Sequence, residues 1–248
     1  MLQFLLAHRR VSSPAIWGKL PGHADFVRSG VRHGEGEGWQ SWLAEHAAMD
    51  TVDVAASLPA AFVLPPRSVT FAPRHFMLGV IAPSEDRAGR RHALLVYQRA
   101  HPRWVHRYFQ AQAGRQRDWL FWLARTMSKH LTVIGLGELR ALERSVHALW
   151  QLHRPEWREL GQTGAAAKSQ DKRDEFAAML LDRCTAANTV APADDAAHGL
   201  NGVRYLPWAD WPGRLHGIRA QGVFWQQDAV GGFVNAGTRL ADLWRTAS

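Results

Sequence analysis

The sequence predicts an α+β fold, in which a mostly antiparallel sheet is flanked by helices in a layered α/β sandwich. Stretches that fit strands are grouped early in the chain and again near its end, and amphipathic helical patterns lie between them. Two apolar runs, residues 76–82 and 93–97, are separated by turn-forming residues and are therefore expected to be antiparallel neighbours. The regular strand–helix alternation of a doubly wound parallel sheet is missing.

The remaining strands are expected on both sides of the helical region. Residues 16–20 form a short apolar stretch between Pro14 and Pro21, which suits a first strand bounded by turns. Val69 and Phe71 alternate with polar neighbours, as the residues of a half-buried strand do. The end of the chain is expected to be β-rich, with strands within residues 203–206, 218–225 and 232–235.

Five segments carry apolar residues at helical spacing and are predicted to form helices. The first follows a glycine-rich stretch at residues 34–38, and Pro155 ends the fourth. Their apolar faces are, in order, Trp39, Trp42, Leu43 and Ala47; Trp104, Val105, Tyr108 and Phe109; Trp119, Leu120, Leu123, Met127 and Leu131; Leu139, Leu142, Val146 and Leu149; and Phe176, Met179, Leu180 and Cys184. We expect a core at residues 14–160, an exposed linker at 161–170, and a C-terminal helix and β-rich portion at 171–248 that packs on the same domain. Its tryptophans, Trp208, Trp211, Trp225 and Trp244, either close the core or contact a partner.

Composition indicates a cytoplasmic protein with a basic surface. Cys184 is the single cysteine, so an intrachain disulfide is impossible, and neither a secretory signal nor an apolar run of about 18 residues is present. We therefore expect no membrane insertion. The formal charge is +8, with 26 arginines and 4 lysines. Residues 87–117 contain eight arginines and no acidic residue, which reflects either genome composition or a face that binds an acidic partner.

No motif in the sequence supports catalysis. A phosphate-binding loop, a dinucleotide-binding glycine motif after a strand, and a Gly-x-Ser-x-Gly nucleophile are all missing. Cys184 lies on the apolar face of a predicted helix, where a buried structural thiol is expected. The thirteen histidines are scattered, and the adjacent Glu85 and Asp86 should point in different directions. We therefore predict no enzyme activity, no catalytic residue, no cofactor and no metal site.

Two segments resemble the motifs of a known family. Residues 17–28 read Trp-Gly-Lys-Leu-Pro-Gly-His-Ala-Asp-Phe-Val-Arg, and residues 79–90 read Gly-Val-Ile-Ala-Pro-Ser-Glu-Asp-Arg-Ala-Gly-Arg. Together they resemble the type VI secretion-associated TagF family, also called ImpM, over residues 14 to about 130. The tryptophan-containing helix between the motifs is similar as well. One departure is Ala24, where family members often have glycine before the Asp-Phe pair.

This resemblance implies a function without catalysis. Members of the family regulate type VI secretion after translation, commonly as repressors of assembly, and some act with a forkhead-associated scaffold protein. The implied partner is therefore such a scaffold. The candidate partner-binding or motif residues are Lys19, Pro21, Asp25, Phe26, Arg28, Pro83, Ser84, Asp86, Arg87, Gly89 and Arg90.

The motif residues also permit a structural hypothesis. Asp86 is placed to close a hairpin loop, and Asp25 is expected to pair with Arg87 or Arg90, so that the two motifs meet at one edge of the sheet. Asp25 and Arg28 would fix the loop after the first strand. Stabilisation of the loops and direct contact with a partner both remain open for these residues.

A second function class is a module that binds single-stranded nucleic acid. The arginines of residues 87–117 are interleaved with aromatic residues that can stack on bases, namely Tyr97, Trp104, Tyr108 and Phe109. Most of these rings fall on faces that are expected to be buried, and lysines are scarce. We therefore expect no nucleic acid to bind, and steeply salt-dependent binding of an oligonucleotide would reverse that expectation.

Overall fold

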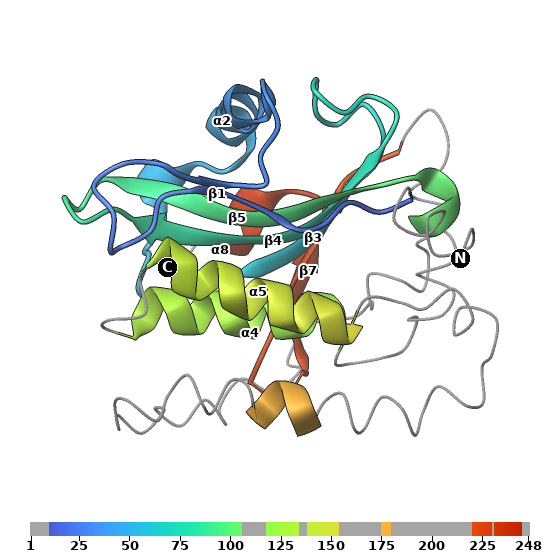
Figure 1. Ribbon diagram of the computed structural model, residues 1–248. Helices are drawn as coiled ribbons and strands as arrows, with labels where there is room; N and C mark the ends of the chain where they lie inside the picture. Colours follow the sequence, from blue (N-terminus) through green and yellow to red (C-terminus); the bar gives the residue numbers. More distant parts are fainter. Residues whose placement is uncertain are drawn as a thin grey trace.

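The computed structural model describes residues 10–105, 118–133, 138–153, 175–179, 220–229 and 231–244. In these ranges an antiparallel seven-stranded sheet with the order β2-β1-β5-β4-β3-β6-β7 separates two helical layers (Figure 1). The α+β fold class is confirmed. The strands are β1 (Ala15–Gly18), β2 (Val27–Ser29), β3 (Ala60–Leu64), β4 (Phe76–Glu85), β5 (Arg91–Ala100), β6 (Val223–Gln227) and β7 (Phe233–Gly237).

The helices cover both faces of the sheet. On one face α4 (Trp119–Thr132) and α5 (Leu139–His153) pack side by side, and on the other lie α2 (Glu35–His46) and α8 (Leu240–Trp244) (Figure 1). Each face of the sheet carries its own apolar core, and successive residues of β4 point alternately into one core and the other. Leu78 faces α4, and Met77 faces α2. The central strands are therefore buried on both faces, which explains their continuous apolar sequence.

The central hairpin is confirmed, although its loop is shorter than expected. β4 and β5 pair from Phe76↔Ala100 to Glu85↔Arg91. Pro83 and Ser84, which were expected in the loop, lie in β4. The turn is therefore confined to the residues from Asp86 to Arg90, and its geometry fixes the candidate site described below.

Two local predictions were wrong. Val69 and Phe71 lie in turns, and the strand of this region is β3, which sequence reasoning missed. β3 is buried along its whole length, so it has no polar alternation, and the prolines next to it gave the region the character of a turn. The glycine-rich residues 34–38 do not precede α2, because the helix begins at Glu35.

Close packing explains the glycines inside α2. A Cβ atom at Gly36 would lie 2.9 Å from Nε1 of Trp17, and one at Gly38 would lie 2.2 Å from Cδ1 of Phe71. The helix therefore approaches its neighbours more closely than any larger residue permits, and this close packing outweighs the poor helix propensity of glycine. The helical predictions around Trp39, Trp119 and Leu139 are confirmed.

The C-terminal strands belong to the same sheet as the N-terminal ones. β6 pairs with β3, and β7 follows at the edge, a few residues beyond the predicted positions. Trp225 and Trp244 are both 2% exposed, so these two tryptophans close the core. Several predictions concern residues outside the described ranges. They are those for 161–170, 203–206, Tyr108, Phe109, Leu180, Cys184, Trp208 and Trp211. None of the described helices is both long enough and apolar enough to cross a membrane.

Candidate functional site

The two motif segments meet at one end of the β1–β5–β4 region. β1 ends at Gly18, and the following loop contacts the β4–β5 hairpin through its backbone. The N–H of Arg87 donates to the carbonyl O of His23 at 2.8 Å, and the Ser84 hydroxyl donates to the carbonyl O of Lys19 at 2.9 Å. The prediction that the motifs meet is therefore confirmed, and we call this region the motif junction.

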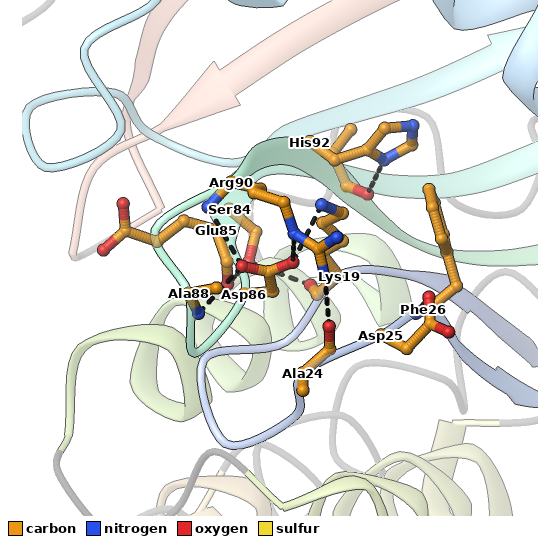
Figure 2. A network of polar contacts seen from close by, with 11 residues as sticks. Lys19, Ala24, Asp25, Phe26, Ser84, Glu85, Asp86, Ala88, Arg90 and His92 are labelled. Carbon is orange, nitrogen blue, oxygen red and sulfur yellow. Dashed lines mark hydrogen bonds and ion pairs between the residues drawn. The ribbon is translucent and has the colours of Figure 1, made fainter.

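Asp86 is the centre of the motif junction (Figure 2). Its Oδ2 atom lies 2.9 Å from Nζ of Lys19 and 2.7 Å from Nε of Arg90. Its Oδ1 atom accepts the N–H groups of Ala88 and Arg90, each at 2.9 Å. The prediction that Asp86 closes the hairpin is confirmed, and the added finding is that the same carboxylate binds Lys19 of the first motif.

The electrostatics of Asp86 follow from these contacts. Its side chain is 0% exposed, and that of Lys19 is 9% exposed. Desolvation by burial alone would raise the pKa of Asp86, but the bond from Lys19 and then those from Arg90 and Ala88 outweigh it and hold the pKa well below its usual range. Asp86 is therefore ionised at neutral pH, and it links the backbone of the hairpin to the side chain of Lys19 in the first motif.

The predicted pairing of Asp25 was wrong. Its Oδ1 atom accepts the N–H of the next residue, Phe26, at 2.8 Å, and within the described ranges it forms no ion pair with Arg87, Arg90 or Arg28. Asp25 is solvent-exposed, so water screens any attraction, whereas the buried Lys19 supplies the charge that Asp86 needs. Arg90 Nη2 reaches the first motif through the carbonyl O of Ala24 instead (Figure 2).

Three aromatic rings pack against one another beside the Lys19–Asp86 ion pair. The ring of Phe26 stacks on Trp17 with centroids 5.3 Å apart, and His92 meets both rings edge-on at 4.7 and 5.2 Å. Lys19 Nζ lies 5.5 Å from the Phe26 centroid, within the range of a cation–π interaction. Burial lowers the pKa of His92, which favours its neutral form.

The eleven residues predicted from the motifs take different positions. Lys19, Pro83, Ser84 and Asp86 are buried, and Pro21 and Phe26 are half-buried. The exposed members are Asp25, Arg28, Arg87, Gly89 and Arg90. The buried members thus hold the junction together, and the exposed members are the most accessible to another molecule.

The arginines of residues 87–117 do not form one face. Arg99 Nη1 lies 3.1 Å from Oε1 of Glu35, with the Arg99 side chain 16% exposed. Arg103 is exposed beyond the opposite end of β5 from the hairpin, and Arg107, Arg115 and Arg117 lie outside the described residues. Tyr97 and Trp104 are 1% and 2% exposed, so these two rings belong to the core and do not offer a stacking surface.

Sequence reasoning missed a second buried polar cluster, which is centred on Glu35. The Tyr97 hydroxyl donates to Oε2 of Glu35 at 2.7 Å, and the N–H of Arg32 donates to the same oxygen at 3.0 Å. Burial, then the Glu35 carboxylate, raises the pKa of Tyr97 far above its usual value. No signal in the sequence separates Glu35 from Glu37, because only the packing of α2 decides which glutamate faces the sheet.

His23 was also missed as a structural residue. Its Nε2 atom accepts the N–H of Leu139, the first residue of α5, at 3.1 Å. This bond satisfies one of the donors that every helix leaves unpaired at its N-terminus. The loop of the first motif is therefore attached both to the hairpin and to the α4–α5 layer.

We expect His23→Ala to destabilise the protein by about 1 kcal/mol, the usual effect of removing a helix cap. Amide hydrogen exchange should become faster in the first turn of α5 and at Arg87, while the centre of α4 stays protected. His33→Ala, at an exposed histidine, is the matched control. Unchanged exchange at Leu139 in the His23 variant would contradict the assignment.

Comparisons with known proteins agree with the position of these motifs. Residues 15–134 match a family model described as the TagF N-terminal domain, type VI secretion system-associated. The crystal structure of PA0076 from Pseudomonas aeruginosa PAO1 is similar, at 26% sequence identity and a TM-score of 0.40. The similar region covers 55% of this chain and 62% of PA0076, so it spans less than two thirds of that protein. Among curated proteins, no sequence matches significantly. Both motifs fall within the matched residues, and residues 15–134 carry the N-terminal domain of the type VI secretion-associated TagF family.

Proposed function

We propose that this protein is a non-catalytic cytoplasmic regulator that represses assembly of the type VI secretion machine after translation. It acts through protein–protein contacts, and its partner is a forkhead-associated scaffold protein of the machine. The match of residues 15–134 to a domain associated with type VI secretion supports the link to this process. The organisation of the motif junction supports a role in binding.

One observation carries the proposal: the hairpin presents Arg87 on a fixed backbone. The N–H of Arg87 is bonded to His23, and Asp86 bonds both sides of the turn, so the loop is already ordered. The side chain of Arg87 is exposed and has no hydrogen bond or ion pair within the described residues. A preordered loop loses little entropy on binding, and arginine is frequent among the residues that dominate interface energies.

The protonation states of the buried groups favour binding over catalysis. A general acid or base works best with a pKa near the operating pH. The low pKa of Asp86 keeps it ionised, and the high pKa of Tyr97 keeps it protonated. Both groups are also engaged in intramolecular bonds, so they support the structure.

Deletion of the gene should raise the release of the secreted tube protein, because a repressor would be lost. The wild-type gene should restore repression, whereas a gene encoding Arg87→Glu should not. Arg103→Glu makes the same charge change at a distant exposed arginine and should restore repression at equal protein levels. Co-purification of the scaffold with wild-type protein, and its loss with Arg87→Glu, would test the partner directly. Unchanged release in the deletion strain would contradict the proposed function.

A further inference from the structure

We propose that an acidic segment of a partner protein docks on the three exposed arginines of the motif junction: Arg28, Arg87 and Arg90. We call these residues the arginine surface. The inference rests on the proposed function and deepens it, because it specifies the chemistry that the partner must present. The recognising groups are guanidiniums, which bind carboxylates through paired hydrogen bonds.

Arg90 is held in place but keeps hydrogen-bond donors for a ligand. Its Nε atom binds Asp86 at 2.7 Å, and Nη2 binds the carbonyl O of Ala24, yet the side chain is 60% exposed. A guanidinium has five N–H donors, so these contacts leave others for a ligand. Because the group is already oriented, a carboxylate that binds it loses little side-chain entropy of the arginine.

Arg28 places a third guanidinium on the neighbouring edge strand. It lies in the middle of β2, directly opposite Trp17 of β1, and residues opposite each other in an antiparallel pair share a face. Trp17 stacks on Phe26, whose ring also meets His92 of β5. Contacts between these rings therefore link Trp17, the pairing partner of Arg28, to the strand that follows the hairpin of Arg87 and Arg90.

The charge pattern favours discrete carboxylates over a continuous phosphate backbone. Lys19 and Arg90 share the single charge of Asp86, so this triad keeps one net positive charge at the base of the surface. Asp25 and Glu85 are exposed beside the arginines and form no ion pair within the described ranges. These carboxylates would repel evenly spaced phosphates, whereas a protein segment can place its acidic residues opposite the arginines alone.

The test measures binding of defined probes to the full-length chain by fluorescence anisotropy at low salt. The probes are a labelled twelve-residue glycine peptide with three glutamates at unequal spacing, its glutamine counterpart, and a twelve-nucleotide thymidine strand. For the glutamate peptide, Arg87→Glu should raise the Kd by about tenfold, which corresponds to about 1.4 kcal/mol. Arg28→Glu should raise it by a smaller factor, and Arg103→Glu by less than about twofold.

Each result bears on the inference separately from the proposed function. An equal loss of peptide binding in Arg87→Glu and Arg103→Glu would overturn it, because the attraction would then reflect net charge alone. Tighter binding of the thymidine strand than of the glutamate peptide would also overturn it. If Arg87→Glu abolishes repression in cells but leaves peptide binding unchanged, the acidic-segment inference fails and the regulatory function stands. If peptide binding depends on Arg87 while secretion does not, the docking chemistry stands and the regulatory function fails.

Discussion

Lys19→Met is expected to lower the free energy of unfolding by about 3 kcal/mol at pH 7, the lower end of the usual loss when one partner of a buried ion pair is removed. The substitution keeps most of the side-chain volume, so the loss is electrostatic. Lys19 is 9% exposed at its side chain and lies 2.9 Å from a carboxylate that is 0% exposed. Arg90 still binds Asp86 in the variant, which is why the estimate is not higher.

Urea unfolding at pH 7 gives the measurement, and Arg90→Met is the matched control. Arg90 contacts the same carboxylate oxygen as Lys19, but its side chain is 60% exposed. Solvent already screens much of its charge, so its removal should cost less than about 1 kcal/mol. Equal losses in the two variants would show that burial does not distinguish these two cations.

The stability difference between wild type and Lys19→Met should also depend on pH. The folded protein holds the pKa of Asp86 below its unfolded value of about 3.9. The ionised carboxylate therefore makes its full contribution to the free energy of unfolding above that pH. As the pH falls below the unfolded pKa toward the folded pKa, this contribution is lost. The difference in free energy of unfolding between wild type and Lys19→Met should then narrow. A difference that widens between pH 5 and pH 3 would contradict the role of the ionised carboxylate.

The sequence predicted the meeting of the two motifs but not the residue that joins them. Turn residues between two apolar runs indicate a hairpin, and Asp86 lies where an aspartate closes such a turn. Its partner Lys19 is 67 residues away. Asp25 lies in the same motif as Lys19 and offers an alternative carboxylate for the same cations. Burial decides between the possible pairs, because a buried charge must be matched and an exposed one need not be.

Burial also explains why β3 and Glu35 could not be predicted from the sequence. Periodicity identifies elements that have one apolar and one polar side, as α4 and α5 do. A strand covered on both faces loses that signal, and β3 is buried at every residue. Glu35 is buried at 3% exposure inside a stretch whose composition suggests a solvent-exposed loop. Only tertiary packing reveals either one.

Gly18→Ala is expected to be the most destabilising single substitution in the first motif, at about 4 kcal/mol from backbone strain and overpacking together. Gly18 has φ of 132°, a conformation that L side chains rarely adopt. A Cβ atom there would lie 2.2 Å from the carbonyl O of Ala93. That oxygen already accepts the N–H of Lys19 at 3.4 Å, and it lies 2.8 Å from Nδ1 of His92. Moving it would disturb Lys19, which belongs to the ion pair, and His92, which lies beside it.

Gly34→Ala separates the two causes of this effect. Gly34 also has a positive φ, 78°, but a Cβ atom there would meet no other atom within 4 Å, so only conformational strain of about 1 kcal/mol is expected. If Gly18→Ala moves β1 away from β5, Lys19 should separate from Asp86, and Lys19→Met should then cost far less in the Gly18→Ala background. Additive losses would mean that the ion pair forms independently of the close strand contact. Equal losses for Gly18→Ala and Gly34→Ala would mean that the contact with Ala93 does not restrict the first motif.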